Sequence, residues 1–327
     1  MKKYSPALLI FVEIFLVGII GFLGYKIWQI SQDRVKGVYV TRINKDDVVF
    51  DLQNKNLKYF YEPKPNTIQV DHPDWLGYEV KYTINSDSLN ERFDYSITKQ
   101  QRTYRVVTIG DSFTFGQNVN TAENYSELLE DILNQKLKCL SINKFEVINL
   151  GVEGYDIEYA IYRLEKRGLK YNPDLVIWLI NDSNYQKINE HLSQIREELK
   201  TKDLPIFDPK TQTYPIVEQA LKIFLNKYGE NFRYHYQENL FKQLNSIHPG
   251  NLLIITYPTI STSLKNIIEN FTKFSNNYLY YDNLINTFAS NSLHLLDHHP
   301  SREGHKKIAA DIFDYLRNNY FKNCISQ

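Results

Sequence analysis

Residues 174–180 (DLVIWLI) constrain the fold most, because this run is almost entirely apolar and is too short for a typical core helix. A strand with apolar side chains on both faces is expected inside a parallel sheet that helices cover on each side. Residues 252–257 (LLIITY) have the same character. Further strand-like runs are residues 105–109 (RVVTI), 145–150 (FEVINL) and 278–281.

Helical patterns lie between these runs. Residues 125–137 have leucine and isoleucine at helical spacing, residues 157–167 form a second helical stretch, and residues 305–320 close the chain as a helix. Strands that alternate with helices predict an α/β fold, in which a parallel sheet is covered on both faces. Chemistry is then expected at the carboxyl ends of the strands.

The chain of 327 residues is long enough for one large domain or two modest ones. We expect residues 1–30 to hold a transmembrane anchor, residues 31–100 a small β-rich lead-in, and residues 101–327 the main domain. A helical insertion at about residues 184–246 is predicted within it, either as a lid or as a solvated layer. Candidate strands of the lead-in are residues 38–42, 47–52 and 78–84.

Residues 7–25 form an apolar segment that is interrupted only by Glu13. As a helix it would span roughly 28 Å, which is close to the core of a bilayer. The segment runs into Lys26, Ile27 and Trp28 with no small-residue cleavage pattern, so an uncleaved anchor is favoured over a cleaved signal peptide. Lys2 and Lys3 favour a cytoplasmic N-terminus, whereas Lys26 favours the opposite orientation. We expect a single-pass membrane protein with its large domain outside the cytoplasm.

Charge and cysteine content exclude some classes of partner. Lys+Arg and Asp+Glu are equal at 38 each, so no net field attracts nucleic acid, and no nucleic-acid partner is expected. Cys139 and Cys324 form neither a disulfide framework nor a C-x-x-C pair. Both are interpreted as structural, and whether they pair stays open.

Polar residues follow the predicted strands where a purely structural strand does not need them. Residues 110–116 (GDSFTFG), 151–155 (GVEGY) and 181–182 (ND) each come directly after a strand, and residues 297–301 (DHHPS) precede the last helix. Any one of these segments alone is more typical of an ordinary turn or helix cap. Their joint occurrence at strand ends favours a catalytic site.

The residue types in these segments fit nucleophilic catalysis. The Ser112 hydroxyl is a poor nucleophile alone and needs a neighbouring base, which His299 can supply while Asp297 orients the ring. The developing oxyanion needs prepared donors, and the candidates are the backbone N–H groups of Ser112 and Gly154 and the side-chain amide of Asn181. A G-x-S-x-G elbow is absent, which argues against the common α/β-hydrolase arrangement.

These motifs resemble those of the GDSL/SGNH hydrolase superfamily. Residues 110–116, 149–155, 180–184 and 297–305 resemble its four blocks, and residues 84–92 resemble a motif of a bacterial membrane-anchored subgroup. The resemblance covers about residues 80–182 and 250–320. It implies a flavodoxin-like three-layer α/β/α sandwich, the SGNH hydrolase fold, with Ser112, Gly154, Asn181, Asp297 and His299 in the roles given above.

The resemblance implies a serine esterase or lipase-type hydrolase that cleaves acyl or acetyl esters of a cell-envelope glycan or lipid, without a cofactor. Two departures from the family pattern bear on the site. The last block has Asp297-x-His299 in place of D-x-x-H, which leaves His298 as an alternative base. The third block has Leu179 where glycine is usual, which bears on the shape of the loop.

Other functions stay open at this point. The same triad would serve an O-acyltransferase that acetylates a cell-surface polysaccharide. The chain could also be a non-catalytic relative that only binds. His294, His298, His299 and His305 cluster with Asp297 and invite a metal site, although a triad explains Asp297 and His299 without metal.

Overall fold

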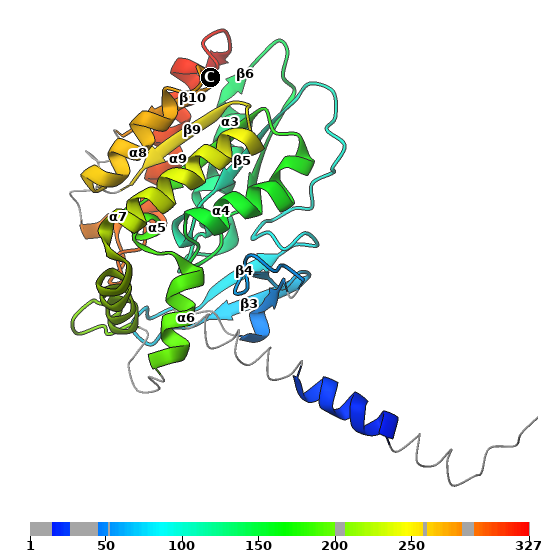
Figure 1. Ribbon diagram of the computed structural model, residues 1–327. Coiled ribbons are helices and arrows are strands. Elements are labelled where there is room, and N and C mark those ends of the chain that lie inside the picture. Colours follow the sequence, from blue (N-terminus) through cyan, green and yellow to red (C-terminus); the bar gives the residue numbers. More distant parts are fainter. Residues whose placement is uncertain are drawn as a thin grey trace, which may run out of the picture.

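The computed structural model describes residues 15–26, 45–51, 53–199, 207–257, 260–282 and 291–326. Within these residues the main domain is built on a five-stranded sheet in the order β10-β9-β8-β5-β7, and each neighbouring pair is parallel (Figure 1). The strands are β5 (Thr103–Ile109), β7 (Lys144–Asn149), β8 (Leu175–Ile180), β9 (Leu252–Thr256) and β10 (Tyr278–Tyr281). Numbered along the chain, this is the flavodoxin-like order 2-1-3-4-5. The predicted α/β fold with a parallel sheet is confirmed.

The central strand β8 shows why its sequence is apolar throughout. Every residue in it is buried. Val176 and Trp178 face one hydrophobic cluster, whereas Leu175 and Ile177 face the other. Side chains of successive residues in a strand point to opposite faces, so a strand covered on both sides must be apolar at every position.

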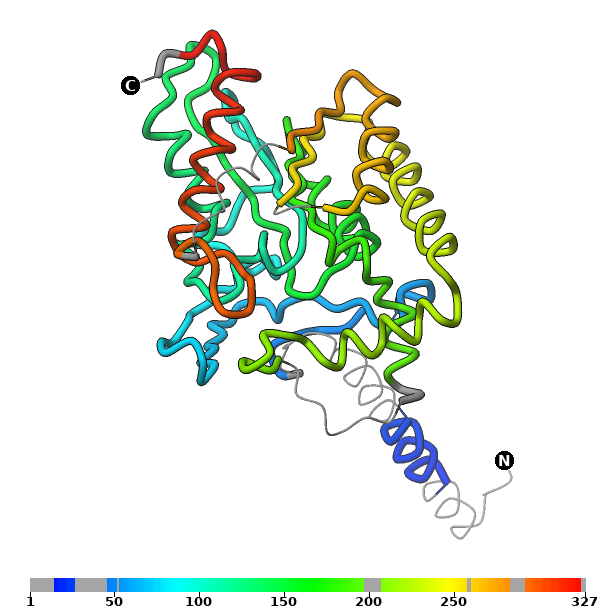
Figure 2. The backbone as a smooth tube through the Cα atoms, turned by 90° about the vertical axis from the view of Figure 1, so that its left-hand side faces the viewer, coloured from blue at the N-terminus to red at the C-terminus, as the bar shows by residue number. Residues whose placement is uncertain are grey.

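Helices form the two outer layers, which Figure 2 shows on either side of the sheet. The first cluster combines the sheet with α4 (Ile157–Arg163), α8 (Thr262–Thr272) and the final turns of α7 (Pro215–Ile247). The second combines it with α3 (Tyr125–Lys136) and α9 (Arg302–Asn319). Short helical turns lie at Lys45–Asp47, Thr121–Glu123, Leu164–Gly168, Leu169–Tyr171 and Asn291–Leu293. The result is a three-layer sandwich.

Residues after β8 form the predicted helical region. They make α5 (Asp182–Gln186), α6 (Asn189–Leu199) and the long α7, in which Gly229 leaves helical geometry at φ 79°. The part of α7 before this kink packs on α6 through Ile216 and Phe224. This part therefore lies beside the carboxyl end of the sheet, while the rest of α7 belongs to the sandwich.

The lead-in consists of two antiparallel strand pairs. They are β1 (Val48–Phe50) with β2 (Tyr61–Pro63), and β3 (Thr67–Asp71) with β4 (Val80–Ile84). The predicted strands at 47–52 and 78–84 match β1 and β4, whereas β2 and β3 were not predicted. The predicted strand at 38–42 lies outside the described residues.

The predicted membrane segment is described only in part. Residues 15–26 form a helix with exposed side chains, and residues 7–14 lie outside the described residues. Among the helices that the structure describes, none combines the length and the apolar character needed to cross a bilayer.

A disulfide ties the C-terminal end of the main domain to the segment after α3. Cys139 and Cys324 form a disulfide, which settles the pairing that the sequence left open. It lies beside a short antiparallel pair, β6 (Leu137–Lys138) with β11 (Ile325–Ser326). The C-terminal residues after α9 are thereby tied to the residues after α3.

A buried ion-pair network ties the lead-in to the sandwich. The guanidinium of Arg163 in α4 donates to Glu62 Oε1 in β2 at 2.6 Å and also to the Ser88 and Leu150 carbonyls. Arg167 donates to both carboxylate oxygens of Glu62. Burial alone would raise the pKa of Glu62, but these arginines outweigh it and lower the pKa to about 2.

We expect Glu62→Gln to lower the free energy of unfolding by about 3 to 5 kcal/mol at neutral pH, because it leaves buried guanidinium charge without its partner. The native pKa of Glu62 is lower than its usual value of 4.5. Its stabilisation is therefore present above pH 4.5 and is lost as the pH falls toward about 2. Urea unfolding of the full-length protein at several pH values measures both effects. Glu79→Gln, at an exposed pair with Lys81, is the control and should change stability by less than about 0.5 kcal/mol.

Candidate active site

Ser112 is held in the tight turn where β5 ends and the short helix α2 (Ser112–Phe115) begins. The Asp111 side chain caps this turn by accepting from the Phe113 N–H at 3.0 Å. Close backbone approach requires glycine at Gly151 in the neighbouring loop, because a Cβ there would lie 2.3 Å from the Phe115 nitrogen. Ser112 is 8% exposed and lines a pocket of about 280 Å³. Its hydroxyl is therefore positioned by a rigid turn and accessible from that pocket.

The structure brings His299 and Asp297 to this serine. His299 Nε2 lies 2.8 Å from Ser112 Oγ, and His299 Nδ1 lies 3.0 Å from Asp297 Oδ2. The second separation is within hydrogen-bonding range, but the ring N–H is not aligned with the oxygen. Such contacts are often poorly aligned without substrate and tighten when it binds. The predicted nucleophile, base and carboxylate thus lie next to one another in the order that a triad needs.

Asp297 has partners that sequence reasoning missed. Asn118 Nδ2 donates to Asp297 Oδ2 at 2.8 Å, and the Tyr214 hydroxyl donates to the same oxygen at 3.4 Å. Asn118 is buried and has a φ of 70°, a left-handed conformation that asparagine adopts more easily than most residues. Neither residue lies in a recognisable motif, so only the folded chain reveals them.

The predicted oxyanion donors line the same pocket as Ser112. Gly154 has a φ of 74°, and its carbonyl accepts from Asn189 Nδ2 at 2.9 Å, which fixes the loop. In the part of the chain that the structure describes, the backbone N–H groups of Ser112 and Gly154 donate no hydrogen bond to another residue. Both donors are therefore available to a bound oxygen.

Asn181 is held rigidly at the carboxyl end of β8. Its Nδ2 donates to Asp111 Oδ2 at 2.9 Å, and its Oδ1 accepts from the Asn184 N–H at 3.2 Å. The amide has a second N–H, so one donor remains for a ligand. Leu179 points into the core between the sheet and α3 and α9, and Asn181 still caps α5. The missing glycine of the third block has not displaced the amide.

The other histidines of the cluster have different surroundings. His298 is exposed at a φ of 67°. His294 Nδ1 contacts the Tyr257 hydroxyl at 3.3 Å, and His305 Nδ1 accepts from the Tyr125 N–H at 3.2 Å. Burial lowers the pKa of His305 to about 3, which keeps it neutral. Within the described ranges, no group of three or more His, Cys, Asp or Glu residues is arranged to hold a metal ion.

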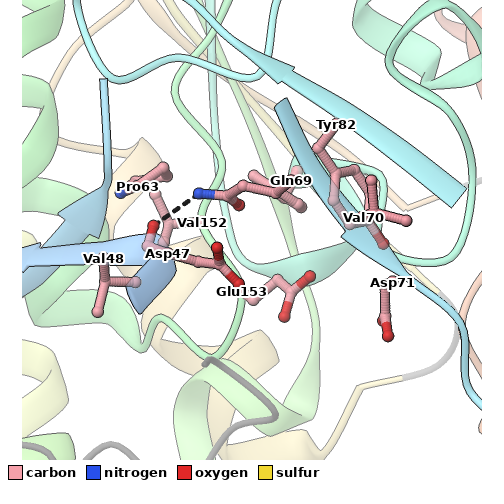
Figure 3. Close-up of a pocket in the computed structure, with 10 residues that line it drawn as sticks. Asp47, Val48, Pro63, Gln69, Val70, Asp71, Tyr82, Val152 and Glu153 are labelled. Carbon is pink, nitrogen blue, oxygen red and sulfur yellow. Dashed lines mark hydrogen bonds between the residues drawn. The ribbon is translucent and has the colours of Figure 1, made fainter. Parts of the chain in front are cut away.

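A second pocket, of about 210 Å³, lies where β1, β3 and β4 meet the loop after β7 (Figure 3). Its lining includes the carboxylates of Asp47, Asp71 and Glu153, and Gln69 Nε2 donates to the Asp47 carbonyl at 2.6 Å. Burial, together with the charge of Asp46, raises the pKa of Asp47. Neither serine nor histidine lines this pocket. The groups for nucleophilic chemistry converge on the pocket at Ser112 instead.

Among known proteins, the chain is similar to several solved structures. No family model matches the sequence, and a search of curated proteins returned no match. Solved structures do resemble the chain. A lipase/acylhydrolase from Enterococcus faecalis is 17% identical with a TM-score of 0.40, and the alignment covers 66% of this chain and 96% of that one. A family 3 carbohydrate esterase from Clostridium thermocellum is 15% identical with a TM-score of 0.41, covering 66% and 96%.

A third similar structure bears the family description itself. It is described as a lipolytic protein of the G-D-S-L family from Desulfitobacterium hafniense DCB-2, is 21% identical with a TM-score of 0.35, and is aligned over 65% of this chain and 99% of that one. Because these TM-scores are low, we base no step of the chemistry on the likenesses.

Proposed function

We propose that the chain is a serine ester hydrolase of the GDSL/SGNH type. The contact of 2.8 Å between Ser112 Oγ and His299 Nε2 carries this proposal, because it pairs a hydroxyl with the base that a serine nucleophile needs. Asp297 stands behind His299, and the donors of Ser112, Gly154 and Asn181 share their pocket. Nucleophile, base, carboxylate and oxyanion donors are the parts that acyl transfer requires.

In the proposed reaction, Ser112 Oγ attacks the ester carbonyl while His299 Nε2 takes the hydroxyl proton. The carbonyl oxygen becomes an oxyanion that accepts from the backbone N–H groups of Ser112 and Gly154 and from Asn181 Nδ2. His299 then gives its proton to the departing alcohol oxygen, which leaves an acyl group on Ser112. Water attacks this acyl group with His299 as base, and the carboxylic acid and free Ser112 are released. Asp297 stabilises the imidazolium in both steps.

The pocket supports a carboxylic ester of modest size as substrate. Phe113, Val217 and Leu221 supply apolar lining, whereas Gln117 and Gln186 supply polar groups. A mixed lining suits an ester with one apolar part and one hydroxyl-bearing part. Acyl or acetyl esters of a cell-envelope glycan or lipid combine these parts, and we propose this class.

The disulfide supports a location outside the cytoplasm. A bond such as that between Cys139 and Cys324 persists in oxidising compartments. Residues 7–25 have the composition of a membrane anchor, and we propose that they tether the domain at the outer face of a membrane. Alkaline carbonate extraction of membranes tests the anchor: retention of the full-length chain in the pellet is expected, and release into the supernatant would contradict it.

Labelling with a fluorophosphonate tests the proposed nucleophile directly. The full-length protein should react with one equivalent of probe at Ser112, and Ser112→Ala should remain unlabelled although folded. Absence of labelling in folded wild-type protein would contradict the proposed function. The acetyl group could instead leave Ser112 faster when a sugar acceptor is added. That result would identify acyl transfer to a polysaccharide, which uses the same catalytic groups.

A further inference from the structure

Lys187 places a positive charge in the pocket at Ser112. It follows α5 directly and lines the pocket together with Ser112 and Asn181. Its carbonyl accepts from Gln237 Nε2 of α7 at 3.1 Å, so its backbone is held between α5 and α7. The residue is half-buried. Its position is therefore set by the fold and not by a mobile surface loop.

The ammonium of Lys187 lacks a close counter-charge. Among the residues that the structure describes, no carboxylate forms an ion pair with it and no acceptor forms a hydrogen bond with its Nζ. Burial lowers the pKa of Lys187, and the charges of Asp111 and Asp156 act against this change. A partly desolvated ammonium of this kind is unfavourable until an anion pairs with it.

The two carboxylates whose charges act on the pKa of Lys187 accept hydrogen bonds from other groups. Asp111 accepts from the Phe113 N–H and from Asn181 Nδ2. Asp156 accepts from the Tyr159 N–H at 2.9 Å and the Asn189 N–H at 2.5 Å, and burial raises its pKa to about 8. Both carboxylates are therefore already hydrogen-bonded by other groups, and neither forms an ion pair with Lys187 among the described residues.

The remaining acidic groups of the pocket are also accounted for. Asp297 is engaged by His299 and Asn118, and Glu218 of α7 lines the pocket as an exposed residue. An exposed charge interacts mainly through water, where its effect is weak. The ammonium of this lining residue, Lys187, is thus available to select among ligands by charge.

We propose that the substrate ester carries an anionic group, a carboxylate or phosphate, which pairs with Lys187 while its carbonyl carbon lies at Ser112. This inference rests on the proposed ester hydrolysis and specifies the substrate class of the same site. Lys187 is then a specificity-determining residue, because its ammonium attracts anionic esters and gives neutral esters of the same shape no compensating contact.

Matched pairs of small esters test the proposal with the full-length protein. Monomethyl succinate differs from methyl butanoate only by a carboxylate at the end of the acyl part. Acetoxyacetate differs from ethyl acetate in the same way in the alcohol part. We expect kcat/KM to favour the anionic ester in at least one pair, mainly through KM. The pair that shows the preference identifies the side of the ester that carries the charge.

Lys187→Met should lower that anionic-over-neutral ratio by about 10- to 100-fold, the range expected for the loss of one charge-assisted hydrogen bond. Lys222→Met on α7 is the matched control, because Lys222 is exposed and does not line the pocket. Its ratio should match that of wild type. A wild-type enzyme without preference in either pair, or an unchanged ratio in Lys187→Met, would overturn the proposal.

Binding to the Ser112→Ala protein separates this inference from the proposed function. Calorimetric titration with each ester needs no turnover, so it decides the role of Lys187 even if no ester is hydrolysed. We expect Ser112→Ala to bind the preferred anionic ester more tightly than its neutral match, and the Ser112→Ala, Lys187→Met double variant to lose this difference. Equal affinities in Ser112→Ala would reject the anion site. Thermal unfolding of each variant verifies that the compared proteins are folded.

Discussion

Ser112→Ala is expected to lower kcat for hydrolysis of 4-nitrophenyl acetate by roughly 10⁴-fold or more. The acyl-enzyme cannot form without Oγ, and His299 then has no hydroxyl to activate. The oxyanion donors of Gly154 and Asn181 remain, so a small residual rate over water is also expected. Initial rates of 4-nitrophenol release, measured with the full-length protein, give the effect.

The size of this loss is informative only if the fold survives. Ser112 is small and loses one hydrogen bond in the variant, which changes stability by about 1 kcal/mol. Thermal unfolding should therefore be nearly unchanged. Ser183→Ala is the matched control, because Ser183 lines the same pocket but has no contact with His299. It should keep activity within a few-fold of wild type, and an equal loss in both variants would contradict the role of Ser112.

The sheet was predictable because burial on both faces forces an apolar sequence. The prediction at 174–180 matches β8, and that at 252–257 matches β9, since each strand is enclosed by helices above and below. The predicted helix at 125–137 matches α3. One face of this helix is buried, and apolar residues that recur at helical spacing are a clear signal in the sequence. These signals are strong because they come from the largest hydrophobic clusters of the molecule.

The two strands of the lead-in that the sequence analysis missed, β2 and β3, gave weaker signals for different reasons. In β3 the apolar side chains of Ile68 and Val70 are exposed, whereas the polar Thr67 and Gln69 are half-buried. The apolar side chains of β3 therefore point away from the neighbouring structure, opposite to the usual inward orientation of the apolar face of a strand. β2 ends at Pro63, which reads as a strand breaker although it tolerates an edge position.

The site residues whose type is restricted by the chemistry could be predicted from the sequence. The residues that belong to the site only because of their position in the fold could not. Ser112, Gly154 and Asn181 follow strands of one sheet, and parallel strands end at one edge, so their convergence could be predicted. Asn118 and Tyr214 reach Asp297 from segments without a motif, and their roles depend on contacts across the fold. Sequence spacing alone also could not choose between the neighbouring histidines.

His299→Ala is expected to lower kcat for the same ester by roughly 10⁴-fold, because Ser112 then has no base and the leaving alcohol has no proton donor. His298→Ala should lower it by no more than a few-fold. His298 is exposed, and its φ of 67° places it in a turn where the backbone reverses between Asp297 and His299. The same assay on both variants measures the difference.

The comparison of these neighbours is a stringent test because they share a loop, a side-chain type and a pocket wall. Loss of loop structure would reduce activity in both variants, whereas loss of the base reduces it in one. Inactive His298→Ala with active His299→Ala would show that the loop rearranges when substrate binds and that the 2.8 Å contact is not the productive one. Retained fluorophosphonate labelling in His298→Ala, with none in His299→Ala, would tie the activated state of Ser112 to His299 independently of any ester substrate.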